Sequence, residues 1–382
     1  ITLTDDDTAS LVVSADNVTV SETGTTSTFT VKLNSEPTSS VSVSLGLNGS
    51  DEFGVSDNLS FSSSDWNTLK TVTVTGADDD VADDNQTSTL TLSSSSSDSY
   101  YSGLSDNVTV TTTDNDTVGL VLSGTNATVS ENGTTSTFTV RLNSAPTANV
   151  TLSLSDNDTT EVLASPTTLT FSSGNWSTSQ VITLTGVDDN VSDGSQSTRL
   201  TLTPSSSGDS KYNSSSLAQS LTTVTTDNDT VGLVLSKTTA TLSESGIMDN
   251  FSVVLTSEPT ANVTLTLSDN DSTEVSATPN TLSFGSGNWS VAQWITLTGK
   301  DDNVSDDNQT TLLTLTPSGG DYSSVSAQTL TVTTSDNDTV GLVLSKSSAL
   351  VSENGSVSDN FSVVLRSEPI ANVTLTFSDN DS

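Results

Sequence analysis

A short marker, Asp-Asn-Asp-Thr-Val, recurs about every 110 residues and divides the chain into copies of one unit. It begins at Asp114, Asp227 and Asp336, and residues 5–7 form a slightly altered copy of it. In all four cases the glutamate of a Ser-Glu motif lies 17 residues after the first aspartate of the marker. Copies of this length are whole domains rather than turns of a solenoid.

The markers set the predicted domain boundaries. We expect the end of one repeat at 1–7, three complete repeats at 8–116, 117–229 and 230–338, and the start of a further repeat at 339–382. Since the chain begins within one repeat and stops within another, we expect it to be a window of a longer array. No apolar run in this window is long enough to span a bilayer.

Each copy contains about seven segments in which apolar and polar residues alternate. Phe29, Val31 and Leu33 alternate with threonine and lysine, as expected of antiparallel strands with one buried face. In the first copy these segments lie at 11–20, 28–33, 41–47, 59–61, 69–75, 88–92 and 108–112. Turn-forming residues separate them, so the sequence predicts an all-β fold of tandem immunoglobulin-like antiparallel sandwiches.

One tryptophan recurs at the same place in every complete copy, at Trp66, Trp176 and Trp289. A ligand-binding platform and a core residue both suit a recurring aromatic side chain. We interpret these three as core residues, because a large apolar side chain at one position of every sandwich fills the space between its sheets.

Composition excludes several classes of function. The chain has 47 acidic and 9 basic residues, a formal net charge of −38, and neither histidine nor cysteine. Such a surface repels nucleic acid and anionic membranes and attracts cations. Without thiol or imidazole groups, the chain has no disulfides and lacks the ligands of most transition-metal sites.

The acidic residues fall in particular loops. If seven strands run alternately up and down, the loops after strands 1, 3 and 5 and the exit of strand 7 share one end. In the first copy these places hold Glu22, residues 51–52, residues 78–84 and the marker at 114–116. Clustered carboxylates on flexible loops favour Ca²⁺ over Zn²⁺, copper or Mg²⁺. The alternative is that these acids are ordinary turn formers and solvating residues, which predicts them at both ends.

Three motifs then resemble those of Calx-beta domains, the calcium-binding sandwiches of sodium/calcium exchangers and extracellular adhesion proteins. They are Ser-Glu-x-Gly at 21–24, Gly-x-Asp-Asp at 76–79 and the closing residues 1–7. The resemblance implies these metal ligands: Glu22, Asp78, Asp79, Asp114, Asp116, Glu131, Asp188, Asp189, Asp227, Asp229, Glu244, Asp301, Asp302, Asp336 and Asp338. The acids that lead into the sixth strand of the family are Asn85-Gln86 here, and a middle marker aspartate is asparagine, which implies weaker binding or fewer ions.

Asparagine occurs mostly in Asn-x-Ser/Thr. Of 29 asparagines, 25 lie in this pattern, although strand alternation and repetition raise the expected number. The excess predicts a secreted, N-glycosylated chain. The predicted glycan sites are Asn17, Asn107, Asn149, Asn175, Asn262, Asn288 and Asn372.

Together these features predict a structural array at the cell surface, such as a surface filament, adhesin stalk or cell-envelope layer. We expect calcium to stiffen its joints, N-linked glycans to coat it, and neighbouring repeats and other copies of the same chain to be its partners. The alternative is a calcium-sensing regulatory module of the ion-exchanger type. An enzyme is the third possibility, since paired acids occur in glycosidases, but the same acids recur in every copy, which suits a structural site.

Overall fold

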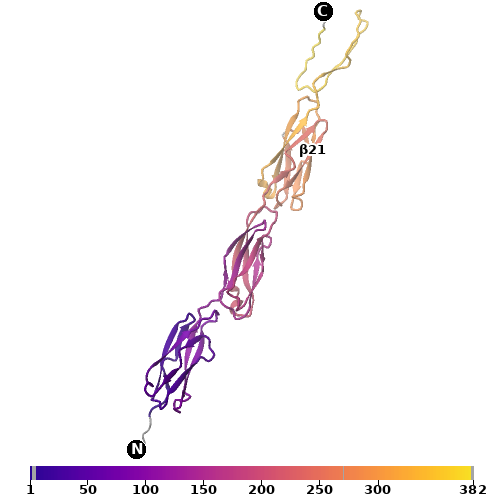
Figure 1. Ribbon diagram of the computed structural model, residues 1–382. Coiled ribbons are helices and arrows are strands. Elements are labelled where there is room, and N and C mark those ends of the chain that lie inside the picture. The colour runs from indigo at the N-terminus through magenta and orange to yellow at the C-terminus, as the bar shows by residue number, and fades with distance from the viewer. Residues whose placement is uncertain (2–5, 270, 380–382) are drawn as a thin grey trace. The chain divides into compact units, whose positions relative to one another are not determined.

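Alternating apolar residues form the sheets of the first repeat in the computed structural model, which describes residues 1, 6–269 and 271–379 (Figure 1). One sheet has four strands in the order β1-β3-β7-β5, and the other has five in the order β2-β9-β8-β4-β6. The strand bounds are β1 (Leu11–Val13), β2 (Asn17–Ser21), β3 (Thr26–Leu33), β4 (Val41–Gly46), β5 (Phe53–Val55), β6 (Leu59–Phe61), β7 (Lys70–Gly76), β8 (Gln86–Ser96) and β9 (Ser105–Thr113).

The second and third repeats have the same two-sheet arrangement. The second contains β10 (Leu120–Leu122), β11 (Asn126–Ser130), β12 (Thr135–Leu142), β13 (Val150–Asp156), β14 (Val162–Ser165), β15 (Thr168–Phe171), β16 (Gln180–Gly186), β17 (Gln196–Ser207), β18 (Gln219–Thr226) and the 3-10 turns η1 (Lys211–Asn213) and η2 (Ser215–Leu217). The third contains β19 (Leu233–Leu235), β20 (Thr239–Ser243), β21 (Met248–Leu255), β22 (Val263–Asp269), β23 (Val275–Thr278), β24 (Thr281–Phe284), β25 (Gln293–Gly299), β26 (Gln309–Ser318), β27 (Gln328–Ser335) and η3 (Gly320–Ser324).

The predicted all-β sandwich is confirmed, with three differences in its strands. The first predicted strand, 11–20, is two strands: β1 pairs with β3 in one sheet and β2 pairs with β9 in the other. The short strand β5 was not predicted, because its middle residue is Gly54 and glycine is depleted in strands. The β2–β9 pair is parallel, unlike the antiparallel pairs around it, since both strands run toward the same end of the sandwich.

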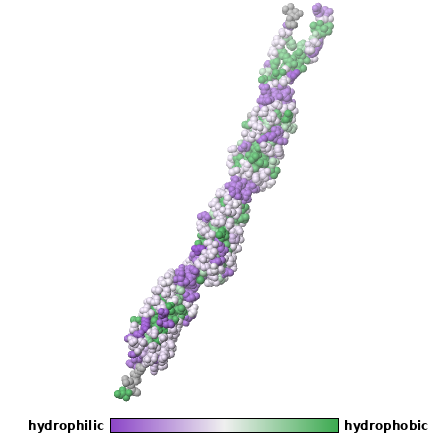
Figure 2. All heavy atoms as spheres, in the orientation of Figure 1, coloured by the Kyte–Doolittle hydropathy of each residue, from purple (hydrophilic) through white to green (hydrophobic). Residues whose placement is uncertain are grey.

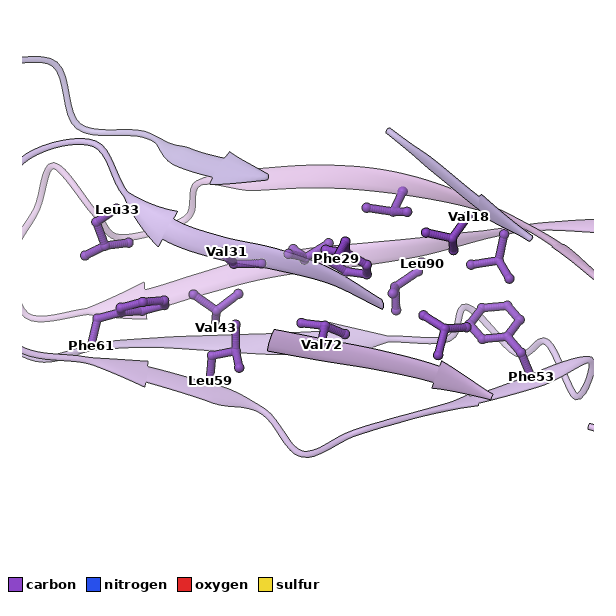
Figure 3. Packing of buried hydrophobic residues seen from close by; sticks show 14 of the residues in the cluster. Val18, Phe29, Val31, Leu33, Val43, Phe53, Leu59, Phe61, Val72 and Leu90 are labelled. Atoms are coloured by element: carbon purple, nitrogen blue, oxygen red, sulfur yellow. The ribbon is translucent and has the colours of Figure 1, made fainter. Parts of the chain in front are cut away.

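The core of each repeat lies between its sheets. In the first repeat Phe29 and Val31 of β3 face Val43 of β4 and Leu90 of β8, and all four are at most 2% exposed (Figure 3). Trp66, Trp176 and Trp289 are half-buried and pack against the three cores, as a core role predicts. The apolar faces of the strands therefore form one continuous core in each repeat.

A buried tyrosine that was not singled out in the sequence closes the end of each repeat opposite the acids. Tyr101 is 1% exposed; its hydroxyl donates to the Ser35 carbonyl (2.7 Å) and accepts from the Ser35 N–H (2.9 Å). Tyr212 and Tyr322 make the same pair of bonds. This tyrosine ties the loop after β3 to the segment before β9.

The chain divides into two compact units, Ile1–Val187 with Ser197–Thr225, and Asp188–Gln196 with Thr226–Ser382. The fourth copy contributes β28 (Leu342–Leu344) and β29 (Val363–Leu365), which pair with each other. Most of the predicted closing segment 1–7, Asp5 included, and residues 380–382 lie outside the described residues. Among the described residues, no helix is long and apolar enough to cross a membrane.

Candidate metal centre

Three loops bring the predicted acidic ligands to one end of the first repeat. Glu22 follows β2, Asp78 and Asp79 follow β7, and Asp114 and Asp116 follow β9. Carboxylate oxygens of Glu22, Asp114 and Asp116 all lie within 4.8 Å of one another. Hydrophilic residues gather at such repeat ends on the visible face (Figure 2). The up-and-down arrangement of the strands thus places these acids together.

The middle residue of the marker organises this group. Asn115 donates its backbone N–H to Glu22 Oε2 (3.0 Å) and its side-chain Nδ2 to Asp78 Oδ1 (3.0 Å). Asp116 N–H donates to Asp114 Oδ1 at 2.7 Å. An aspartate at position 115 could not donate through its side chain, so the asparagine that departs from the family pattern holds two loops together while adding no charge.

The central carboxylates are buried and crowded. Glu22 is 1% exposed. Burial raises the pKa of its carboxyl, the Asn115 N–H lowers it, and the charges of Asp114, Asp79 and Asp83 raise it again. Burial is also the largest cause that raises the pKa of Asp116, followed by the charge of Asp114. Burial and the neighbouring negative charges both disfavour the ionised form of these carboxyls. A bound cation would compensate that cost.

The third repeat builds the same arrangement from its own residues. Asn337 donates its N–H to Glu244 Oε2 (3.2 Å) and its Nδ2 to Asp301 Oδ1 (2.8 Å). Oxygens of Glu244, Asp336 and Asp338 lie within 4.8 Å of one another. Asp302 Oδ1 accepts the Val304 N–H at 2.6 Å. Because the first and third repeats build the same arrangement from different residues, the arrangement is a property of the repeat.

The predicted ligands of the second repeat belong to both compact units. Glu131 is 1% exposed and lies in the first unit, whereas Asp188, Asp189, Asp227 and Asp229 lie in the second. Within the second unit, Asn228 Nδ2 donates to Asp188 Oδ1 (3.1 Å) and Asp229 N–H donates to Asp227 Oδ1 (2.6 Å). These bonds match those of the other two repeats.

One acidic position per repeat was left out of the predicted ligand set. Glu52, Glu161 and Glu274 each lie 30 residues after the Ser-Glu glutamate, directly before β5, β14 and β23. Glu274 is 4% exposed and its Oε2 has no hydrogen-bond partner. Burial and then the charge of Asp306 raise its pKa. The constant spacing is the signal in the sequence, but it becomes informative only with the burial of Glu161 and Glu274 and the partial burial of Glu52.

The donor set fits a calcium ion. Ca²⁺ binds oxygen ligands at about 2.4 Å, so two of its ligands are at most about 4.8 Å apart, and the grouped oxygens satisfy that limit. Asp83 Oδ1, Asp306 Oδ1 and Asp229 Oδ2 are buried without a hydrogen-bond partner. Partnerless buried carboxylate oxygens cost free energy unless a cation compensates them. In such a site Ca²⁺ would supply charge neutralisation and cross-linking of loops.

The loop after the seventh strand also contacts the following repeat. The Asp80 carbonyl accepts the Ala145 N–H at 2.6 Å within the first unit. The equivalent carbonyls of Asn190 and Asn303 accept the N–H groups of Glu258 (2.6 Å) and Glu368 (2.5 Å) within the second unit. An exposed ion pair between Lys211 and Asp84 (2.8 Å) adds to the first of these contacts. The loop that carries two candidate ligands therefore also carries the main-chain contact to the next repeat.

The asparagines predicted to carry glycans differ in their surroundings. Asn17, Asn107, Asn149, Asn262 and Asn372 are exposed. Asn175 and Asn288 accept hydrogen bonds from the backbone of their own turns, at Ser172 and Gly285. By contrast, the marker asparagines use their Nδ2 groups within the acid clusters. We therefore expect lower glycan occupancy at the marker asparagines than at the exposed ones.

The pKa shifts predict opposite pH dependences with and without calcium. Because burial raises the pKa of Glu22, Glu244 and Asp116, the folded state binds protons more readily than the unfolded state. In chelator, stability should therefore increase as the pH falls from 7 toward 5. In millimolar calcium it should decrease over the same range, because protons compete with the ion. Thermal melts in both buffers would test this, and parallel curves would contradict it.

Carboxyls with lowered pKa values do not interfere in that range. Hydrogen bonds from Thr38 and Tyr100 lower the pKa of Asp98. Such groups contribute stability that is lost only as the pH falls through their lowered values, below about 4. The change in stability between pH 7 and pH 5 therefore reports only the carboxyls whose pKa values are raised.

The Calx-beta domain model matches residues 4–116, 113–230 and 226–338. No curated protein sequence matches the chain. Among solved structures, similarity extends to the calcium binding domain CBD12 of CALX1.1, with 15% identity, 56% of this chain and 98% of that chain covered, and a TM-score of 0.29. It also extends to the protocadherin γB4 extracellular domain, at 14% identity, 91% and 52% coverage and a TM-score of 0.37. With its three matched repeats, the chain belongs to the Calx-beta domain family.

Proposed function

We propose that this chain is part of an extracellular structural array in which Ca²⁺ binds at the acidic end of each repeat and stiffens the joint to the next. The observation that carries the proposal is the double role of one loop. In the first repeat it supplies Asp78 and Asp79 to the acid cluster and presents the Asp80 carbonyl to Ala145 of the following repeat. An ion that orders this loop would therefore also order the joint.

The chain's own residues prepare this arrangement. Asn115 fixes Glu22 relative to Asp78 before any ion binds, which lowers the entropy cost of forming the site. Glu52 and Asp83 add further carboxylate groups: burial raises the pKa of Glu52, and the nearby charge of Asp83 raises it further. Without a cation, the crowding of like charges destabilises these loops, so the joint should be looser in chelator.

A structural role is also consistent with repetition. Calx-beta domains are non-catalytic binding modules, and each complete repeat carries the same acids in the same positions. An enzyme needs one differentiated active site, whereas a joint needs the same site at every boundary. We propose a non-enzymatic array at the cell surface, with N-linked glycans on exposed asparagines and with neighbouring repeats and other copies of the chain as partners.

Small-angle scattering from residues 8–338 would test the proposal. Adding millimolar Ca²⁺ to chelated protein should increase the maximum dimension and narrow its distribution, because ordered loops restrict bending at the joints. Mg²⁺ at equal ionic strength is the control, since it fits flexible multi-carboxylate sites poorly. Identical scattering curves in chelator and calcium would refute calcium-stiffened joints.

A further inference from the structure

A tryptophan lies on the solvent face of the third repeat. Trp294 in β25 is 57% exposed, although its neighbour Ile295 is 1% exposed and faces the core. Strand alternation explains this, because successive side chains point to opposite faces of the sheet. The sheet has the order β19-β21-β25-β23, so Trp294 lies on a central strand, with its side chain on the outer face of that sheet.

An asparagine of β21 (labelled in Figure 1) shares that outer face. Asn250 is exposed, whereas Phe251 beside it is fully buried. Ser252 is the Cα partner of Trp294, and Asn250 is the partner of Thr296. Asn250 and Trp294 are therefore diagonal neighbours on one face, a relation that separates side chains by about 7 Å.

These two residues occur together in one complete repeat and not in the other two. At the Asn250 position the first and second repeats have Thr28 and Thr137, and at the Trp294 position they have Thr71 and Val181. Asn250-Phe251-Ser252 is an Asn-x-Ser sequon, whereas the threonines cannot carry an N-linked glycan. Among the three complete repeats, the glycan acceptor and the exposed aromatic ring thus occur together in the third.

We propose that Asn250 is N-glycosylated and that the first sugar of the glycan packs on the indole of Trp294. The inference rests on the glycosylated, extracellular array proposed above. In the transfer, Asn250 Nδ2 forms a bond to C1 of an oligosaccharide carried on a polyprenyl diphosphate. The bond between C1 and the diphosphate breaks, the lipid diphosphate leaves with the electron pair, and the amide loses one proton.

The geometry suits a sugar of this kind. An N-acetylhexosamine has an apolar C–H face, and its ring extends about 5 Å from the amide nitrogen, a reach comparable to the diagonal spacing. Packing there removes apolar indole surface from water, which is favourable. The exposed Met248, two residues before Asn250 on the same face, extends the apolar surface.

Burial of Ser252, the third residue of the sequon, dictates when the sugar is added. Ser252 is 9% exposed, and its N–H donates to Ser236 Oγ at 2.9 Å. The enzyme that transfers the oligosaccharide must contact this serine. Attachment of the glycan must therefore precede the folding of the third repeat. Glycan at Asn250 is therefore a mark of chains modified while unfolded.

Secretion of the full chain from a eukaryotic host, followed by glycopeptide mass spectrometry, tests occupancy. We expect Asn250 to be occupied, together with the exposed control Asn262 of the same repeat. A bare Asn250 beside an occupied Asn262 would overturn this inference alone. Bare asparagine at every sequon would overturn both the inference and the glycosylated array.

A double-mutant cycle tests the packing. Asn250→Gln removes the glycan and Trp294→Thr restores the residue type of the first repeat. We expect Asn250→Gln to lower Tm by about 3 °C when Trp294 is present and to change it little when Trp294→Thr is present. Asn262→Gln should shift Tm equally in both backgrounds. Equal effects of Asn250→Gln in both backgrounds would show that the sugar does not contact the indole.

Discussion

Calcium at about 100 times its dissociation constant is expected to raise the Tm of the three-repeat chain by about 10 °C over chelated protein. Ligand linkage at that concentration stabilises each occupied repeat by about 2.7 kcal/mol. For a domain of about 100 residues, each kcal/mol corresponds to about 4 °C. Differential scanning calorimetry in chelator and in calcium measures the shift.

Neutralising the buried glutamates separates this effect from ionic strength. In the triple variant Glu22→Gln, Glu131→Gln and Glu244→Gln, we expect Tm in chelator to be unchanged or higher, because a crowded buried charge is removed while the acceptor oxygen remains. In calcium the same variant should lose most of the 10 °C gain. A variant that lowered Tm equally in both buffers would show that these glutamates act only in folding.

The matched control removes three exposed charges outside the acid cluster. Asp16→Asn, Glu36→Gln and Asp57→Asn change the net charge by the same amount at exposed positions of the first repeat. This variant should keep the full calcium response. Loss of the response in the control would mean that overall charge, and not the buried site, determines calcium binding.

Gly76→Ala is expected to destabilise the first repeat by about 3 kcal/mol, or about 12 °C in Tm. A Cβ at Gly76 would lie 2.0 Å from the Ser21 carbonyl oxygen. Because this oxygen belongs to the backbone, it cannot move aside as the end of a flexible side chain could. The clash would push β7 away from the end of β2, and Glu22 is the residue directly after that end. The variant should therefore also lose part of its calcium response, which calorimetry in both buffers would show.

Gly54→Ala is the control for this prediction. Gly54 lies in β5, which pairs with β7, and an added Cβ there meets no atom within 4 Å. It should change Tm by less than about 2 °C, since surface changes without a clash cost little. Equal destabilisation by the two substitutions would contradict a role for the close approach of Gly76 to Ser21.

Much of the architecture could be predicted because its signals are local. The marker and the fixed spacing to Glu22 define the repeat, and the alternation of Phe29, Val31 and Leu33 defines a half-buried strand. The prediction that acids would gather at one end needed only the direction of successive strands. Each of these inferences depends on residues close in sequence or on strict repetition, and each was available without coordinates.

The tertiary structure decided what depends on pairing between distant strands. It split residues 11–20 between two sheets and placed β2 parallel to β9, because strand partners are chosen by the packing of both sheets together. It also showed that Glu274 is buried and that Asn115 joins Glu22 to Asp78. Sequence by itself determined which residues recur; burial and hydrogen bonding across loops, which set the free energy of a carboxylate, arise only when the loops meet.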